Sequence, residues 1–208
     1  PLAHARLVSV DTSAASTMAG VRLVATQADL DADGVGEIHC EHRLTNSDGT
    51  KMTMVSHPPM VRDVNRTAGD IVAMVVADDA TTAQDALEQI NVRYDGMPAV
   101  TDVYAAMADG APQLYAEYPH NIAFDWHAGE HEATDKALES AEANGYEIFD
   151  IDVINNRVII NSMETRPIIV EPGDEGDSLN VWCGTQGPVG IARQLTNCLL
   201  YTSDAADE

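Results

Sequence analysis

The sequence predicts a fold of mixed helices and strands, of the α/β or α+β class. Two observations predict it. Residues 4–26 and residues 71–94 each contain a strand, a capped helix and a second strand, because short β-branched segments flank stretches with helix caps. Residues 98–119 are rich in Pro and Gly, and they separate this pattern from a second one, which predicts a boundary between two units.

The chain opens with a predicted strand. Residues 4–10 alternate and carry β-branched side chains, and Asp11-Thr12-Ser13 then offers a cap for a short helix that ends near Gly20. Residues 21–26 are the next predicted strand. Residues 27–70 contain many Gly and Pro residues and are expected to be mostly loop.

A continuous apolar run follows at residues 71–77 and predicts a strand buried on both faces. Asp78 and Asp79 then precede a helix over roughly 80–89, and residues 90–94 return as a strand. This order of elements supports the mixed fold class.

The second half predicts one polar helix, a group of strands and a short final helix. The polar helix covers residues 130–144 and is ended by Gly145. The expected strands are 146–154, 156–170 and 179–183, and the final helix covers 189–195.

Charge and cysteine content exclude several classes of protein. Eleven Lys and Arg residues face 34 Asp and Glu residues, so the net charge is 11 − 34 = −23. Such a surface repels phosphate backbones and anionic lipids, which argues against nucleic-acid and membrane partners. No apolar run reaches the length of a membrane span. Cys40, Cys183 and Cys198 form no C-x-x-C pair, which favours a reducing compartment, the cytoplasm.

Three motifs resemble metal sites but are interpreted as ordinary polar segments. Residues 29–34 have the spacing of half a calcium loop, yet Cys40 stands where that loop needs a glutamate, so a solvated turn is expected. Residues 39–42 place four possible ligands in a row, which cannot all reach one ion. His127, His131 and Glu132 lack the H-E-x-x-H spacing.

Two stretches look more like functional or buried polar segments. Residues 155–166 place Asn, Glu and Arg at the ends of an apolar strand, which predicts a paired network. In residues 182–188 a strand ends in a turn with a glycine on each side of Thr185-Gln186, and a helix follows. Gln186 there either presents a free amide to a ligand or closes the turn onto the backbone.

Six segments in order resemble one family. They are residues 1–26 (beginning PLAHARLVSVDTSAA), 68–77 (AGDIVAMVVA), 83–102, 121–126 (NIAFDW), 155–166 and 182–188 (WCGTQGP). The chain resembles the molybdenum-binding large subunit of the xanthine oxidase and aldehyde oxidase family, in particular the branch of the carbon monoxide dehydrogenase large chain.

The resemblance implies an α+β fold with two domains. An α/β hammerhead domain is expected over residues 1–105, followed by a partial molybdopterin-binding domain over residues 106–197. The implied activity is that of a molybdenum-dependent oxidoreductase that uses water as its oxygen source. The implied cofactor is the molybdenum–molybdopterin cofactor, and the implied partners are an iron–sulfur small subunit, an FAD-binding medium subunit and a small-molecule substrate.

The same resemblance assigns roles to few residues of this chain. Gln186 matches the family's T-Q motif and is the candidate catalytic and cofactor-binding residue, as a hydrogen-bond donor to an oxo ligand of molybdenum. Glu164 and Arg166 match a motif interpreted as structural. No residue of the chain is predicted to be a direct metal ligand.

Residues 198–208 depart from the family pattern and resemble translated sequencing-adapter DNA. We therefore expect a non-native tail on a fragment of a longer environmental gene, inactive by itself. The substrate stays open between carbon monoxide, an aldehyde and an N-heterocycle. The alternative is a non-catalytic acidic binding or assembly module with a hammerhead-like fold.

Overall fold

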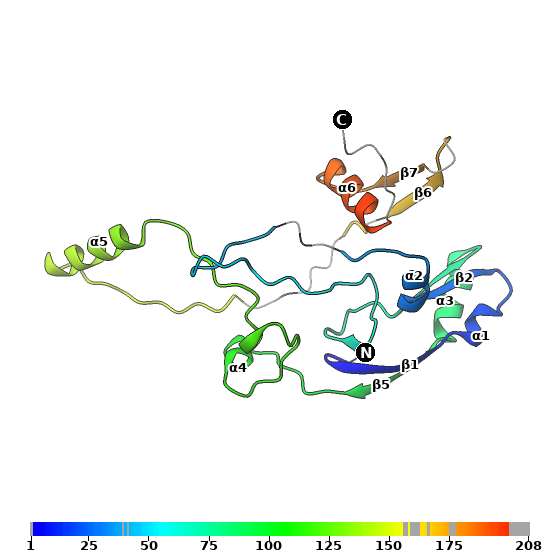
Figure 1. Cartoon of the computed structure of the whole chain (residues 1–208), viewed down its shortest axis with the longest axis horizontal. Coiled ribbons are helices and arrows are strands. Elements are labelled where there is room, and N and C mark those ends of the chain that lie inside the picture. The colour runs from blue at the N-terminus through cyan, green and yellow to red at the C-terminus, as the bar shows by residue number, and fades with distance from the viewer. Residues whose placement is uncertain are drawn as a thin grey trace. The chain divides into compact units, whose positions relative to one another are not determined.

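The computed structural model describes residues 2–38, 40, 42–155, 158, 163–165, 167–174 and 178–199. Its chain forms two compact units, the first of Pro1–Trp126 with Ala192–Glu208 and the second of His127–Ile191. Figure 1 shows the order of their elements. The domain boundary at 105/106 stays a prediction, and the compact first unit continues beyond it to Trp126.

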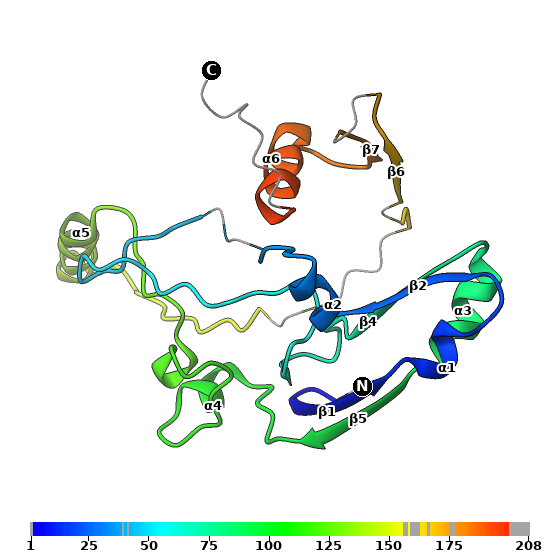
Figure 2. The same ribbon diagram turned by 45° about the vertical axis from the view of Figure 1, so that its right-hand side comes forward.

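The first unit contains a three-stranded antiparallel sheet in the order β3–β1–β5. These strands span Val64–Asn65 (β3), Ala5–Asp11 (β1) and Asn91–Gly96 (β5). β1 and β5 lie side by side, with Ala5 opposite Gly96 (Figure 2). The alternating side chains of β1 and β5 made both strands predictable, whereas β3 is too short to leave a pattern.

A second antiparallel pair joins β2 (Val21–Thr26) to β4 (Ala73–Ala77). Helices α1 (Ser13–Ser16) and α3 (Ala80–Glu88) contact this pair. α3 begins where the sequence predicts, because the Asp79 side chain accepts the backbone N–H of Thr82 and so satisfies one of the free donors of the first turn.

The described residues cover only one face of the β2–β4 pair, so the expectation of a strand buried on both faces is wrong. Met74 and Val76 of β4 are 38% and 45% exposed, and so is Leu23 opposite Val76, at 48%. Val75, which points to the other face, is half-buried. A short apolar run indicates that both faces of a strand are apolar. Whether each face is buried depends on whether another helix or sheet packs against it.

The core of the first unit is built mainly from small residues. Its buried apolar residues are Ala5, Ala15, Ala25, Met60, Val61 and Ala86. His4, Gln27 and Asn65 are buried as well. Each has a hydrogen-bond partner, as when Nδ1 of His4 donates to the Pro98 carbonyl at 2.7 Å. No buried side-chain polar atom among the described residues lacks a partner.

Residues 44–52, within the predicted loop, fold back on themselves as a narrow arm. The backbone N–H of Asn46 donates to the Thr50 carbonyl at 2.7 Å, and Gly49 takes a φ of +84° at the tip, a conformation that favours glycine. The Ser47 N–H donates to the Asp125 carbonyl at 2.8 Å. The arm therefore joins residues that lie almost eighty positions apart in the sequence.

The stretch after β5 is held to the first unit by polar contacts. It contains α4 (Val103–Met107) and the short 3₁₀ turn η1 (Pro119–Asn121). The Arg66 guanidinium lies 4.2 Å from the centre of the Tyr115 ring, and its Nε donates to the Leu114 carbonyl at 2.8 Å. These contacts explain why this Pro- and Gly-rich stretch packs with the first unit.

Asn121 fixes the course of the same stretch through three hydrogen bonds. Its Nδ2 donates to the carbonyls of Ala106 and Pro112, at 2.9 and 3.1 Å, and its Oδ1 accepts the Leu114 N–H at 2.9 Å. Its backbone is left-handed, with a φ of +57°, a conformation that asparagine tolerates better than most residues.

The second unit begins with a polar helix, α5 (His131–Ala143), close to its predicted bounds. The strand predicted at 146–154 is wrong, since the structure shows no strand there. Tyr146, Phe149 and Ile151 are each more than 70% exposed. A strand needs a hydrogen-bonding neighbour as well as alternation, and no described residue supplies one to this segment.

The second unit continues with an antiparallel hairpin of β6 (Ile168–Pro172) and β7 (Leu179–Cys183). β7 has its predicted bounds, whereas β6 covers only the end of the strand expected over 156–170, part of which lies outside the described residues. No described residue of His127–Ile191 is buried, so the described part of this unit forms no core.

Helix α6 (Pro188–Cys198) follows β7. Of the predicted tail, Cys198 ends this helix and Leu199 follows it, while residues 200–208 lie outside the described part of the chain. Across the described residues, no helix is both long and apolar enough to cross a bilayer.

Candidate functional site

The turn between β7 and α6, residues 184–187, is the candidate site. It begins at a fixed point, because Cys183 at the end of β7 is paired with Ile168 of β6. It ends at another, because α6 starts at Pro188, whose ring restricts φ to a helical value. The Ile191 N–H then donates to the Gly187 carbonyl at 3.1 Å and closes the first turn of the helix.

The side chain that closes the turn is Thr185 rather than Gln186. The Gly187 N–H donates to the Thr185 hydroxyl oxygen at 3.1 Å. Gln186 is exposed, and its amide makes no hydrogen bond with any described residue. Of the two interpretations that the sequence leaves open, the structure therefore agrees with the free amide.

The glycines around Gln186 leave the turn open. A Cβ atom added at Gly184, Gly187 or Gly190 would meet no other atom within 4 Å, and none of these residues has a left-handed φ. Neither the backbone conformation nor a neighbouring atom therefore requires glycine here. Glycine lets a ligand approach a backbone closely, so the turn is compatible with a group that binds against it.

The first four residues of the acidic motif, 29–32, are helical, and only Asp33 and Gly34 form a turn, which corrects part of the sequence-based expectation. Helix α2 spans Gln27–Ala32 and starts with a capping box, in which Asp29 accepts the Thr26 N–H at 2.7 Å. This hydrogen bond lowers the pKa of Asp29. The Asp31 carboxylate forms an ion pair with Arg62. The motif therefore stabilises the fold, and its carboxylates are not arranged around an ion.

Arg62 is the centre of a network that the sequence did not reveal. It is bonded to Asp31 through two nitrogens, and its Nη1 lies 3.1 Å from Oε1 of Glu37. Ser56 donates to the same Glu37 oxygen at 2.5 Å, and these two bonds lower the pKa of Glu37. The network fixes both ends of the long loop after α2.

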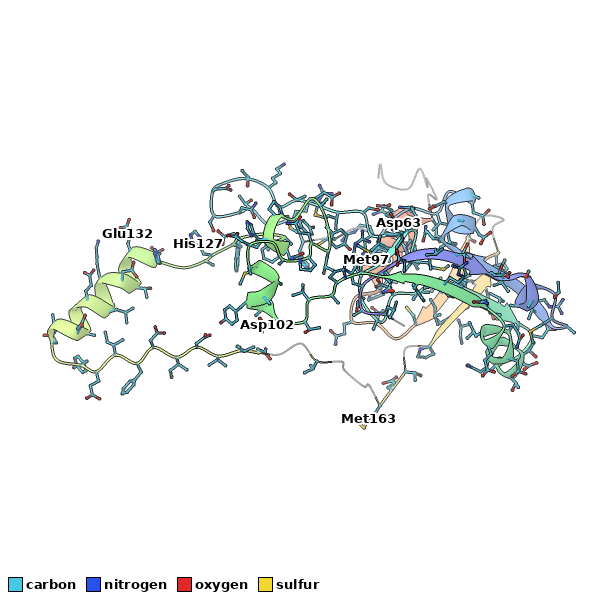
Figure 3. All side chains as sticks on the ribbon, turned by 90° about the horizontal axis from the view of Figure 1, so that it is seen from below. Asp63, Met97, Asp102, His127, Glu132 and Met163 are labelled. Atoms are coloured by element: carbon cyan, nitrogen blue, oxygen red, sulfur yellow. The ribbon has the colours of Figure 1, made fainter. Side chains whose placement is uncertain are left out.

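The described members of the histidine clusters do not converge on a metal site. Figure 3 shows His127 on the loop before α5 and Glu132 on the first turn of that helix. Glu132 and His131 each face a residue one turn further along, Lys136 at 4.0 Å and Asp135 at 3.5 Å. The described residues contain no group of three His, Cys, Asp or Glu side chains placed to hold a metal.

Parts of two predicted motifs lie outside the described residues. They are His39 and Glu41 of the first cluster, and Asn156, Arg157, Asn161, Ser162 and Arg166 of the predicted polar network. Within the described part, the Cys40 thiol donates to the His42 carbonyl at 3.2 Å, and Glu164 is exposed. The paired network therefore stays a prediction.

Two family models match the chain in the order that the sequence suggested. Residues 1–98 match the α/β hammerhead domain of aldehyde oxidase and xanthine dehydrogenase, and residues 114–205 match the molybdopterin cofactor-binding domain. The chain belongs to the xanthine oxidase and aldehyde oxidase family. Gln186 and its turn lie within the part matched to the molybdopterin cofactor-binding domain.

Relatives of known function are similar to most of this chain. The nicotine 6-hydroxylase large subunit of Paenarthrobacter nicotinovorans is 32% identical over 90% of this chain. The carbon monoxide dehydrogenase large chain of Afipia carboxidovorans is 28% identical over 89% of it. The chain spans only 22% and 23% of the length of these two relatives.

Solved structures agree with this family. Quinoline 2-oxidoreductase from Pseudomonas putida 86 gives a TM-score of 0.75 at 26% identity, covering 96% of this chain and 24% of its own. The Cu,Mo-CO dehydrogenase gives 0.69 at 26% identity, covering 95% and 24%. The expected α+β architecture, a hammerhead domain followed by the start of a molybdenum-cofactor domain, is thereby confirmed.

Proposed function

We propose that these residues act in the large subunit of a molybdenum-dependent hydroxylase, an oxidoreductase that takes its oxygen from water. The observation that carries the proposal is the free Gln186 amide on an open turn, inside the part matched to the molybdopterin cofactor-binding domain. A hydroxylase subunit and a dehydrogenase chain are similar to this chain over 90% and 89% of its length.

The residues present fit a molybdenum–molybdopterin cofactor in one respect. A carboxamide N–H is a neutral donor suited to an oxo ligand, and the glycines around it leave room for close approach. When bound, the cofactor supplies the redox centre that accepts electrons from the substrate. Gln186 would bind and orient that centre by donating its amide N–H, and this donation is the contribution of the chain that we assign.

The partners and location follow from the same proposal. Relatives are named as large subunits or as a subunit of a complex, so we propose an iron–sulfur small subunit and an FAD-binding medium subunit as electron acceptors. A cytoplasmic location is consistent with the three free cysteines Cys40, Cys183 and Cys198. We assign residues 1–105 to the hammerhead domain and 106–197 to part of the cofactor-binding domain.

The substrate is a small molecule, and the relatives differ in which one they use. One relative hydroxylates nicotine, another is a carbon monoxide dehydrogenase, and a structural neighbour is a quinoline oxidoreductase. We therefore propose three substrate classes for testing: an N-heterocycle, an aldehyde and carbon monoxide.

The test uses the whole protein that carries this chain, produced with its two proposed partner subunits. We expect mass spectrometry to find one molybdenum per large subunit. We also expect the enzyme to reduce an electron-accepting dye when it is given a substrate from one of the three classes. Isotopic oxygen from labelled water should enter the product of the heterocycle or aldehyde. A protein that binds no molybdenum and oxidises none of the substrates would instead be the non-catalytic acidic assembly module.

A further inference from the structure

The hydrogen bond between Thr185 and Gly187 determines how Gln186 is presented. The acceptor is the hydroxyl oxygen of Thr185, and the donor is the backbone N–H two residues later, at 3.1 Å. Gln186 is the single residue between them. The bond therefore restricts the backbone on both sides of Gln186, and with it the direction of the Cα–Cβ bond from which the amide extends.

Other contacts do not fix that direction. Gln186 is exposed and makes no hydrogen bond with any described residue, and the flanking Gly184 and Gly187 have open space around them. A glutamine has three rotatable side-chain bonds, so an unrestrained backbone would spread its amide over many positions. Thr185 supplies the side-chain restraint that spans Gln186, whereas the Ile191 N–H bond to the Gly187 carbonyl holds only the end of the turn.

We propose that Thr185 is a positioning residue for Gln186, so that its hydroxyl group aims the Gln186 amide without touching cofactor or substrate. This inference rests on the proposed function, in which Gln186 donates to the molybdenum centre. A preorganised donor is effective only when its geometry is held before the reaction.

Two substitutions separate positioning from general stability. Thr185→Val keeps the β-branched shape and removes the acceptor, whereas Thr185→Ser keeps the acceptor and removes a methyl group. Thr185 is exposed, so neither change leaves a core cavity. The matched variant Gln186→Ala removes the amide itself.

The first readout needs no cofactor. Amide hydrogen exchange of Gly187, measured by NMR on the 208-residue chain, should be faster in Thr185→Val and near wild type in Thr185→Ser. The second readout uses the holoenzyme with its subunits. Thr185→Val should lower kcat about two- to tenfold with little change in KM, the effect of losing one ordinary hydrogen bond, and Thr185→Ser should restore it.

A third readout is the electron paramagnetic resonance spectrum of the molybdenum centre in the reduced holoenzyme. We expect Thr185→Val to alter it in the same direction as Gln186→Ala, at unchanged molybdenum content and melting temperature. A purely structural threonine would leave this spectrum unchanged.

The outcomes distinguish this inference from the proposed function. If Gln186→Ala lowers kcat but Thr185→Val matches wild type, the inference is overturned and the proposed function stands. If Gln186→Ala leaves kcat and the spectrum unchanged at full molybdenum content, the role of Gln186 fails, and the inference fails with it. A loss of kcat in Thr185→Val that Thr185→Ser does not restore also overturns the inference.

Discussion

Arg62 and Asp31 form a two-point ion pair: Nη2 of Arg62 lies 2.8 Å from Oδ1 of Asp31, and Nε lies 3.1 Å from Oδ2. The two residues are 31 positions apart, so the pair closes the loop that follows α2. Two parallel hydrogen bonds give this contact a defined geometry, which single-point surface pairs lack. A contact of this kind should be detectable in the stability of the first unit.

Replacing Asp31 with Asn should lower the melting temperature by about 2–4 °C, because Arg62 loses one of its two paired carboxylates and the one it contacts at two points. The matched control is Asp33→Asn, which removes one carboxylate two residues away that forms no ion pair within the described part of the chain. Thermal unfolding followed by circular dichroism measures both. Equal melting temperatures for the two variants would show that the pair contributes nothing specific.

The same pair should make stability depend on pH in the acid range. Hydrogen bonds from Arg62 and Gln27 lower the pKa of Asp31 from 3.8 to about 2. The folded protein therefore binds this proton less tightly than the unfolded chain, so the stabilisation is complete above about pH 4 and is lost as the pH falls toward 2.

Urea unfolding of wild type and Asp31→Asn between about pH 6 and 2 tests this dependence. The difference between the urea concentrations at which the two proteins are half unfolded should be constant down to about pH 5. It should shrink to nothing near pH 2. Subtracting the variant removes the parallel contributions of carboxylates that do not contact Arg62 and whose pKa is also lowered: Asp11, Asp29, Asp48 and Asp79. A difference that grows as the pH falls would contradict the assignment.

Asn121→Ala should destabilise the first unit by about 2–4 kcal/mol, because three side-chain hydrogen bonds are lost at once. Asn121→Gly loses the same bonds, but glycine adopts the left-handed backbone without strain. Its loss of stability should therefore be about 1 kcal/mol smaller than that of Asn121→Ala. Urea unfolding of both variants gives the two values. Equal losses would mean that the φ of +57° adds no strain in the alanine variant.

Gln186→Ala in the holoenzyme should lower turnover about 10²- to 10³-fold, the typical effect of removing one preorganised donor. Its melting temperature should stay unchanged, because the side chain is exposed and makes no hydrogen bond with a described residue. Steady-state kinetics with molybdenum content measured on the same sample tests this. Normal turnover at full occupancy would exclude a catalytic role for Gln186.

Local pattern was sufficient for much of the fold. The sequence closely predicts three features that depend only on neighbouring residues. They are the alternation of β1, the Asp79 cap of α3 and the bounds of β7. Helix α2 was missed because its last four residues, 29–32, begin the segment that has the spacing of a calcium loop. Only the structure shows that Thr26 binds Asp29 and that Arg62 binds Asp31, two of the three carboxylates of that motif.

Features that depend on distant residues could not be predicted. The segment 146–154 has the alternation of a strand, but pairing needs a neighbouring strand, which alternation does not supply. Gln186 could be singled out from its glycine-flanked turn. The sequence could not show that its neighbour Thr185 makes the turn-closing bond, since both side chains carry an acceptor at suitable spacing.

The β6–β7 hairpin presents apolar side chains on both faces, with Ile168, Ile169 and Val170 all more than half exposed in consecutive positions. Its two outer edges are also unpaired within the described residues. During synthesis, such a ribbon is a ready ligand for holdase chaperones and a template for sheet growth between neighbouring nascent chains. The yield of this protein in a cell therefore depends on how quickly these two faces and two edges are covered after they leave the ribosome.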